Sequence, residues 1–338
     1  MNPQSTRGTQ SELIHSGGYR CRVCAGTGPF GIHSVREMMF ASGRRFSYAM
    51  CPDCGCLQIL EVPVDLAFHY GEGYYSFSAG DSGPRSMVAS WLVRARNEHL
   101  SGRFNPLGAV VARVKPYTAL ASVKSLRLAR STRVLDVGCG GGELLRALRL
   151  AGFGRLTGVD PFVAAELDLG GGARVLRCEL AEVTGEFDLV MFHHSLEHMP
   201  DPCAALQCAF DRLAPGGTCL VRIPTVSSWA WRHYGVDWCS LDAPRHLMLH
   251  SRRSIEQLAQ SCGFQLDRIV DDSNGFQFWG SEQYRRGIAL MRPGCNDIVP
   301  APGAFTRAEL REFERRAAAL NQAGDGDQIA VYLTRPAR

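Results

Sequence analysis

Short apolar segments alternate with helical segments from residue 133 to the end of the sequence. Apolar runs separated by helices are typical of a parallel sheet that carries helices on both faces. The sequence therefore predicts an α/β fold with a Rossmann-like, doubly wound sheet of seven strands. The predicted strands are residues 133–138, 155–160, 173–178, 187–193, 218–224, 264–270 and 328–334.

Capping residues mark the ends of several predicted helices. Asp201 can cap a helix after the fourth strand, with Pro202 in its first turn and two glycines beyond its end. Near the C-terminus, Thr306 and Glu309 form a capping box at the start of another helix. A further helix is predicted from residue 86 to about residue 100.

The stretch VLDVGCGGGELL, residues 134–145, places a run of glycines directly after the first predicted strand. Gly138, Gly140 and Gly142 let the backbone turn sharply and approach a ligand at the carboxyl edge of the sheet. A dinucleotide fingerprint needs a third glycine, yet that position carries a glutamate or a leucine, depending on the starting glycine. The loop therefore favours a cofactor without a pyrophosphate.

Asp160 stands at the end of the second predicted strand, 18 residues after Gly142. An acidic residue about 20 residues beyond a glycine loop binds ribose hydroxyls in nucleotide-binding sheets. A cofactor with ribose hydroxyls and an amino-acid tail fits both features.

Two C-x-x-C pairs lie near the N-terminus, Cys21 with Cys24 and Cys51 with Cys54. Each pair can turn two thiolates toward one point, and two such knuckles supply the four sulfurs that zinc prefers. The segment between the pairs has the aromatic and β-prone residues of a hairpin around Gly43. We predict a small zinc ribbon with a structural Zn²⁺. The alternatives are two unrelated pairs of free thiols or a redox pair.

Four ordered motifs, VLDVGCGGG, GVD, FDLVMFHHSLEHMPDP and LAPGGTCLVRIP, resemble those of the class I S-adenosylmethionine (SAM)-dependent methyltransferases over residues 131–270. The resemblance implies SAM as cofactor. It also implies roles for individual residues. The methionine portion would be held by Asp136, Gly138, Gly140 and Gly142, and the ribose by Asp160.

The adenine of the cofactor would lie against the segment after the third strand. The family usually has an aspartate there, whereas this sequence has RCEL, which offers Glu179 instead. The loop from His193 to Glu197, after the fourth strand, would line the methyl-transfer face.

The resemblance also includes the order of the segments along the chain. A zinc-binding segment followed by this domain, with YYSF and APRHLMLHS, is similar to bacterial methyltransferases of sugar and polysaccharide pathways. This similarity implies a sugar or related metabolite as methyl acceptor.

Histidines around Glu197 and in the loop after the fifth strand are the candidate catalytic residues. In the deoxysugar C-methyltransferases that loop carries a histidine, and His246 is at the matching place, so we expect it to be the general base, ahead of His194 and His198. Arg245 replaces the acidic neighbour that the family has there. Two alternatives stay open: a metal site formed by His194, Glu197 and His198, and a purely structural bond from His246 to its own loop.

Four aromatic residues precede His246 in WAWRHYGVDW, namely Trp229, Trp231, Tyr234 and Trp238. We expect them to form a hydrophobic cap over the cofactor or a stacking wall for the acceptor.

The composition narrows the function classes. The 37 basic and 33 acidic side chains are dispersed and give a net charge of +4, which does not favour nucleic-acid binding. The N-terminus lacks the apolar core of a signal peptide, and the most apolar stretch, residues 107–123, is interrupted by charges and a proline. We therefore expect a cytoplasmic protein that is not in the membrane. The oligomeric state stays open.

The predicted organisation has four parts: a flexible tail over 1–20, the zinc ribbon over 21–58, a helical linker over 59–130 and the methyltransferase domain over 131–338 with an insertion at about 272–327. The favoured function is methyl transfer to a small molecule. The alternatives are an RNA methyltransferase that holds its substrate with the ribbon, and a non-catalytic SAM-binding adaptor.

Overall fold

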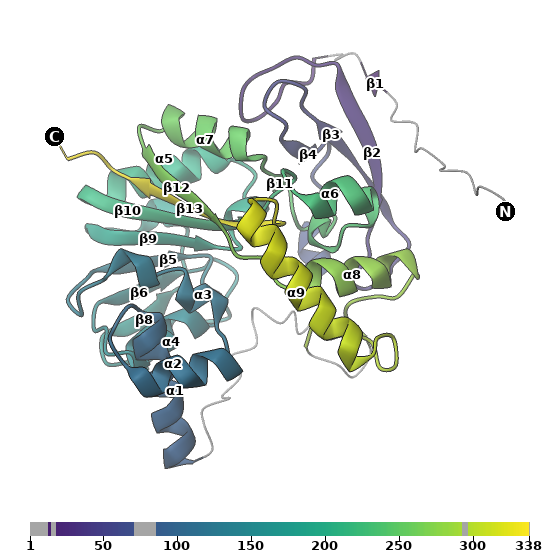
Figure 1. Cartoon of the computed structure of the whole chain (residues 1–338). Coiled ribbons are helices and arrows are strands. Elements are labelled where there is room, and N and C mark those ends of the chain that lie inside the picture. The colour runs from purple at the N-terminus through teal and green to yellow at the C-terminus, as the bar shows by residue number, and fades with distance from the viewer. Residues whose placement is uncertain (1–12, 15–17, 71–85, 293–296, 338) are drawn as a thin grey trace.

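The computed structural model describes residues 13–14, 18–70, 86–292 and 297–337, so most of the predicted tail lies outside it (Figure 1). The described chain forms two lobes, each built on its own sheet. None of the described helices is both long and apolar enough to cross a membrane.

The larger lobe contains an eight-stranded sheet. All seven predicted strands are present. The eighth is a short antiparallel strand at the edge, β7, which the apolar pattern misses because its four residues, LDLG, include an aspartate and a glycine. The predicted final strand runs antiparallel to both of its neighbours. In spatial order the strands are β12 (Gln265–Asp271), β13 (Gln328–Thr334), β10 (Leu213–Pro224), β9 (Phe187–His193), β5 (Val134–Val137), β6 (Leu156–Val159), β8 (Ala173–Leu176) and β7 (Leu167–Gly170).

Helices cover both faces of this sheet, as a doubly wound fold requires. One face packs against α5 (Pro202–Arg212) and α7 (Arg252–Ser261) through a buried aliphatic cluster. The other face packs against α4 (Glu143–Leu150) and helices of the predicted linker. Those linker helices are α1 (Met87–Leu100), α2 (Pro106–Val114) and α3 (Thr118–Ala121).

The predicted caps are formed. The Asp201 side chain accepts a hydrogen bond from the backbone N–H of Ala204. Thr306 and Glu309 form the capping box of α9 (Arg307–Ala323). Ser86 caps α1 by accepting from the N–H of Ala89. These helices therefore begin at the capping residues that the local sequence provides.

The smaller lobe contains a five-stranded sheet that joins the ribbon to a strand from the larger part of the chain. The expected hairpin is formed by β2 and β3, with Gly43 at a φ of +80° in the connection. A strand from beyond β10, β11, completes the sheet by pairing with β4. In order the strands are β1 (Leu13–Ile14), β2 (Phe30–Arg36), β3 (Arg45–Met50), β4 (Leu57–Ile59) and β11 (Met248–Leu249).

Three helices pack on the ribbon side of the molecule: α6 (Trp229–Tyr234), α8 (Phe276–Arg285) and α9 (Figure 1). Two of them, α8 and α9, come from the predicted insertion. The aromatic residues of α6 and its neighbour Trp238 belong to this core, and Trp238 is fully buried with its indole N–H donating to Asp327. They therefore pack between the ribbon and the rest of the chain, and their expected role as a cap or stacking wall stays a prediction.

Candidate functional site

The four ribbon cysteines converge on one point. The Sγ atoms of Cys21 and Cys54 are 3.5 Å apart, those of Cys24 and Cys51 are 3.6 Å apart, and all four lie within 4.8 Å of one another. Zn–S bonds of about 2.3 Å in a tetrahedron place sulfurs roughly 3.8 Å apart. The described geometry therefore fits a tetrahedral zinc ion, and the thiols are not two unrelated pairs.

Both knuckles have the same backbone geometry. The carbonyl of Cys21 accepts from the N–H of Ala25, and the carbonyl of Cys51 accepts from the N–H of Gly55, each at 2.9 Å. Ala25 and Gly55 have positive φ angles of 58° and 73°. A further donor, Gln58 Nε2, lies 2.8 Å from Cys21 Sγ and would stabilise thiolate charge.

The glycine loop follows β5 at the carboxyl edge of the large sheet. Gly138, Gly140 and Gly142 all have positive φ angles, of 71°, 50° and 78°. A Cβ on Gly138 would lie 2.5 Å from the Cβ of Ser195, so this loop packs closely on the loop that follows β9. The glycines are therefore required by the backbone conformation and, at Gly138, by contact with the second loop.

Two carboxylates lie beside this loop. Asp160 accepts from the N–H of Gly140 and from the N–H of Phe162, both at 2.9 Å. Asp136 is buried, and its Oδ1 has no hydrogen-bond partner among the described residues. Burial, followed by the charge of Asp160, raises the pKa of Asp136 to about 7. An unpartnered buried carboxyl next to a second carboxylate favours a cationic ligand.

The two remaining cofactor candidates lie at the same edge of the sheet. Glu179 follows β8, is exposed, and takes part in a capping box with Glu182. His193 ends β9, and neither of its ring nitrogens has a hydrogen-bond partner in the described part of the chain. Burial, then the charge of Arg222, lowers the pKa of His193, so its imidazole is neutral.

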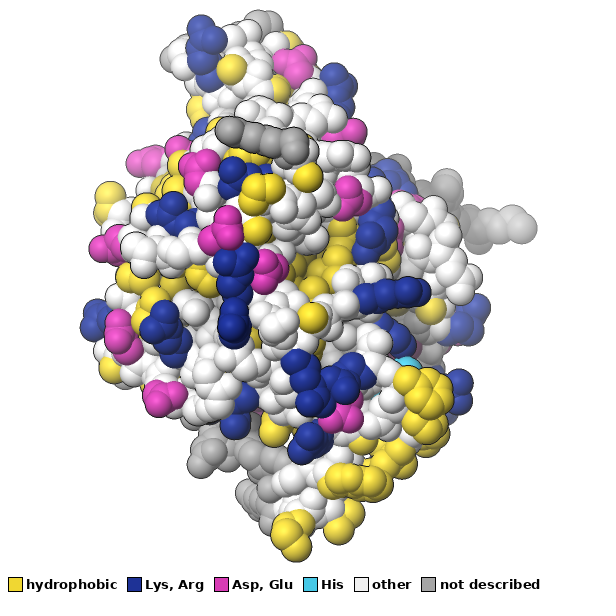
Figure 2. Space-filling view, turned by 90° about the vertical axis from the view of Figure 1, so that its left-hand side faces the viewer, with side chains coloured by type: hydrophobic (Ala, Val, Ile, Leu, Met, Phe, Trp, Pro, Cys, Tyr) yellow, Lys and Arg dark blue, Asp and Glu magenta, His cyan; other side chains and the backbone are white. Residues whose placement is uncertain are grey.

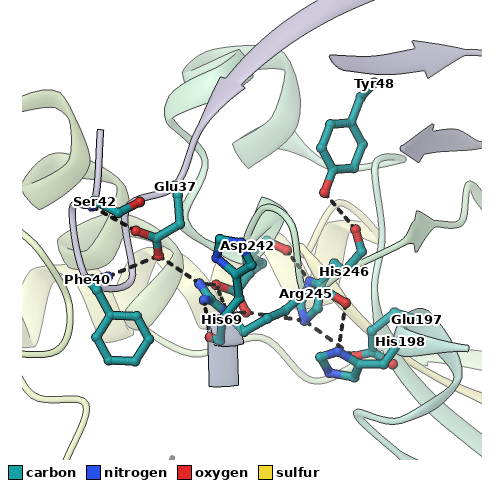
Figure 3. Close-up of polar contacts among 11 residues, drawn as sticks. Glu37, Phe40, Ser42, Tyr48, His69, Glu197, His198, Asp242, Arg245 and His246 are labelled. Carbon is teal, nitrogen blue, oxygen red and sulfur yellow. Dashed lines mark hydrogen bonds and ion pairs between the residues drawn. The ribbon is translucent and has the colours of Figure 1, made fainter. Parts of the chain in front are cut away.

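Three of the predicted catalytic residues, Glu197, His198 and His246, come from two loops and lie close together (Figure 3). Glu197 and His198 lie in the 3-10 turn after β9, and His246 lies just before β11. One potential ligand atom from each lies within 4.8 Å of the others. The His198 and His246 rings are 4.7 Å apart and form an edge contact. The structure therefore joins residues that are about 50 positions apart in sequence.

His194 takes a different position from the one expected. Its Nε2 accepts hydrogen bonds from the Arg222 guanidinium and, at 3.1 Å, from the Gln328 amide. The proton is therefore on Nδ1, which lies 3.3 Å from Glu197. The group within metal-ligand distance is Glu197, His198 and His246, in place of the expected group with His194.

The tautomers of His198 and His246 follow from backbone carbonyls. His198 Nδ1 lies 2.9 Å from the carbonyl of Arg245, and His246 Nδ1 lies 2.8 Å from the carbonyl of Ser240. A carbonyl can only accept, so Nδ1 donates in both rings and Nε2 is the basic atom of the neutral imidazole. The predicted bond from His246 to its own loop therefore exists, and it leaves Nε2 available for chemistry.

The pKa values of both Glu197 and His198 are lowered, so that Glu197 is ionised and His198 is neutral near pH 7. Burial, together with the charge of His246, lowers the pKa of His198 to about 4. Burial works against the charged form of Glu197, yet the neighbouring histidines lower its pKa to about 2. A carboxylate and a neutral imidazole therefore face each other near neutral pH.

A buried ion pair anchors the loop of His246. Arg245 is fully buried, and its guanidinium contacts Asp242 at 2.5 Å and Glu37 of the ribbon segment at 3.2 Å. Tyr48 of β3 donates to the carbonyl of His246 at 2.8 Å. The sequence suggested that Arg245 leaves His246 without an acidic partner. In the structure Asp242 and Glu197 supply carboxylates 3.9 and 4.0 Å from His246 Nε2.

Sequence reasoning missed Asp242 and Glu37. Asp242 is four residues before His246, and this spacing could have indicated it. Glu37 comes from a distant segment with no local signal, and only the fold brings it to Arg245.

Comparisons with known proteins show what part of the larger lobe is similar to. Residues 109–269 match a family model described as a methyltransferase domain. The ubiquinone biosynthesis O-methyltransferase of Psychrobacter arcticus is 36% identical over 102 residues, which cover 26% of this chain and 39% of the relative. The protein of that name from Pseudomonas putida is 37% identical over 99 residues, which cover 25% of this chain and 41% of the relative. The chain thus spans about two fifths of the length of these curated relatives.

A solved structure from Thermotoga maritima, a SAM-dependent methyltransferase described as a possible histamine N-methyltransferase, is 17% identical with a TM-score of 0.40. The match covers 71% of this chain and 99% of that one. Residues 109–269 are thus similar to a methyltransferase domain, and the curated relatives share this similarity over about a quarter of the chain.

Proposed function

We propose that the protein transfers a methyl group from SAM to a small-molecule acceptor. The observation that carries the proposal is the meeting of two features at one sheet edge. The glycine loop with the unpartnered Asp136 suits a cationic cofactor, and the cluster of Glu197, His198 and His246 lies on the adjoining loops.

The residues beside the glycine loop suit the charges of SAM. The cofactor carries a sulfonium and an ammonium group, and both are attracted to the carboxylates of Asp136 and Asp160. In the proposal Asp136, Gly138, Gly140 and Gly142 hold the methionine portion and Asp160 the ribose. Glu179 lies beside the adenine and His193 beside the methyl group.

SAM supplies an electrophilic methyl group. The acceptor atom forms the new bond to the methyl carbon, the carbon–sulfur bond breaks, and its electron pair stays on sulfur. An in-line displacement of this kind depends on positioning, and an acceptor that carries a proton must also lose it. We assign this activation to Glu197, His198 and His246. His194 takes a supporting role because Arg222 and Gln328 occupy its Nε2.

A sugar or related metabolite is the proposed acceptor, on the strength of the zinc-ribbon arrangement in the sequence. The curated relatives give a second candidate, because they are named for ubiquinone biosynthesis. An RNA acceptor is less supported. On the face shown in Figure 2, basic and acidic side chains are interspersed, whereas an RNA-binding surface gathers positive charge.

The ribbon has a structural role in the proposal, with one zinc ion held by Cys21, Cys24, Cys51 and Cys54. Four thiolates close the coordination shell and leave no open position for chemistry.

Calorimetry with SAM, S-adenosylhomocysteine and NAD tests the cofactor assignment. We expect both SAM and its demethylated product to bind, and NAD to bind much more weakly because the loop lacks the third glycine of a dinucleotide site. Tighter binding of NAD, or no binding of either SAM species, would overturn the proposal. If the protein binds SAM but forms no S-adenosylhomocysteine with any acceptor, the result would instead support the non-catalytic adaptor.

A further inference from the structure

Glu197 is a fully buried carboxylate, and neither of its oxygens accepts a well-aligned hydrogen bond from the described residues, although the Nδ1–H of His194 lies nearby. Its Oε1 lies 3.3 Å from His194 Nδ1, without the alignment of a hydrogen bond, and 4.0 Å from His246 Nε2. A buried carboxylate normally accepts several hydrogen bonds or binds a cation, because its desolvation is otherwise uncompensated. The unsatisfied oxygens of Glu197 therefore favour a cation as their partner.

Two imidazoles present basic nitrogens to the same point. The carbonyls of Arg245 and Ser240 fix the Nδ1–H tautomer of His198 and of His246, so that Nε2 carries the lone pair in each. A histidine whose Nδ1–H donates to a backbone carbonyl is the usual arrangement of a metal-ligating histidine. The carbonyls also fix the ring orientations before any ion binds.

The surrounding charges favour a cation as well. Within the described part of the chain, the cluster contains the buried carboxylates Glu197, Asp242 and Glu37, and one buried guanidinium, that of Arg245. Negative charge is therefore in excess, and Asp242 Oδ2 lies 3.9 Å from His246 Nε2. A carboxylate at this distance adds to the negative charge around the proposed ligand atom.

We infer that Glu197, His198 and His246 bind a divalent transition-metal ion of the zinc class, at a site separate from the four cysteines. Their ligand atoms lie within 4.8 Å of one another, and two imidazoles with one carboxylate form a ligand set that zinc and its neighbours accept. Three protein ligands leave at least one open position.

The chemical consequence rests on the proposed function. An acceptor hydroxyl at the open position would be acidified by the ion, and its proton would pass to water, which leaves an oxygen nucleophile for the methyl group. His246 Nε2 would then act as a metal ligand, in place of the general base expected from the sequence.

Metal analysis of the full chain tests the inference without any acceptor. Protein is saturated with Zn²⁺, passed over a desalting column and measured by elemental analysis, in the wild type and in Glu197→Gln and His246→Asn. We expect a second equivalent of zinc in the wild type and its loss in both variants. His233→Asn, which removes a histidine outside the cluster, is the matched control and should keep both equivalents.

Cobalt substitution identifies the site that is lost. Co²⁺ bound to thiolates gives sulfur-to-metal charge-transfer absorption, whereas Co²⁺ bound to two imidazoles and a carboxylate gives only weak visible bands. In Glu197→Gln the thiolate bands should persist, which also shows that the ribbon is folded, while the weak visible bands disappear. In Cys51→Ser, Cys54→Ser the thiolate bands should disappear.

A single zinc equivalent in the wild type, or a second equivalent that survives both Glu197→Gln and His246→Asn, would overturn the inference. Binding of S-adenosylhomocysteine is measured on the same samples. If the wild type holds one ion but binds S-adenosylhomocysteine, only the inference of a second metal site fails. If the wild type holds two ions but does not bind S-adenosylhomocysteine, only the proposed function fails.

Discussion

Asp136 is the residue whose environment departs most clearly from that of an ordinary surface carboxyl. Its pKa rises to about 7 because the side chain is buried and then because Asp160 lies nearby. In the unfolded chain the pKa returns to about 3.9. The folded state therefore binds the proton more tightly, and stability falls as the pH rises from about 4 to about 7.

Asp136→Asn removes this dependence. Relative to the variant, the ligand-free wild type should lose up to about 1.4 kcal/mol of unfolding free energy per pH unit across that window. Urea unfolding at pH 5 and pH 8 measures the difference, with Asp267→Asn on an exposed edge strand as control. An equal pH dependence in wild type and Asp136→Asn would contradict the raised pKa.

Asp160 has two partners in the glycine loop region, the N–H groups of Gly140 and Phe162. Asp160→Ala should weaken SAM binding at least ~10-fold, since a charged acceptor for two ribose hydroxyls is lost and the loop loses its support. Asp160→Asn retains one acceptor oxygen and should lie between. Calorimetry provides the measurement, and unchanged affinity in Asp160→Ala would refute the assignment.

The contact between Asp160 and the glycine loop can be predicted from spacing, because strand, loop and helix follow each other directly along the chain. The presence of His246, and not His194, in the group with Glu197 and His198 cannot be predicted in this way. It depends on Arg222 and Gln328, which come from two other strands and occupy His194.

At the scale of elements, the pairing of β4 with β11 connects the ribbon to the loop that carries His246. The N–H of Ile59 donates to the carbonyl of Leu247 at 2.9 Å, one residue after His246. Tyr48 of β3 contacts the carbonyl of His246 itself. A folded ribbon should therefore hold the loop of His246 in place through these hydrogen bonds, without a ligand that contacts both sites.

The Cys51→Ser, Cys54→Ser variant tests this coupling. We expect it to lose the ribbon zinc and to lower the thermal midpoint by several degrees, because metal binding contributes directly to the folding of such a segment. Hydrogen exchange at residues 246–249 should become faster, while exchange in β5 and β9 stays slow. Unchanged exchange at 246–249 after zinc loss would show that the loop is held independently.

The ion pair between Glu37 and Arg245 links two elements from opposite ends of the chain. In Glu37→Ala, buried Arg245 keeps Asp242 but loses one carboxylate, so the unfolding free energy should fall by roughly 1–3 kcal/mol. Urea denaturation measures this change. Glu61→Ala, at an exposed position, is the control and should change stability little.

At the scale of the whole molecule, the large sheet was predictable and the lobe arrangement was not. All seven predicted strands exist. Five of them are parallel strands, which read as apolar runs because they are buried, whereas the last two pair antiparallel. The sequence of the insertion has no pattern that predicts which part of the chain it packs against. Its helices α8 and α9 bury their apolar faces against the ribbon and α6, a contact between segments more than 200 residues apart.

This arrangement also changes the interpretation of the ribbon. Residues of the insertion, of the loop that carries His246 and of the ribbon share one hydrophobic core. A ribbon that bound a partner independently, as in an adaptor, would not need to share a hydrophobic core with the rest of the chain. The arrangement favours an enzyme in which the smaller lobe shapes the acceptor side of the site.

Transfer of a labelled methyl group tests the central claim most directly. Wild-type protein and His246→Ala are incubated with methyl-labelled SAM and a metabolite extract, and the small-molecule and RNA fractions are counted separately. We predict label in the small-molecule fraction and a transfer rate ~10²-fold lower in His246→Ala, with cofactor binding nearly intact. Label only in RNA, or no transfer by a wild-type protein that binds SAM, would contradict the account.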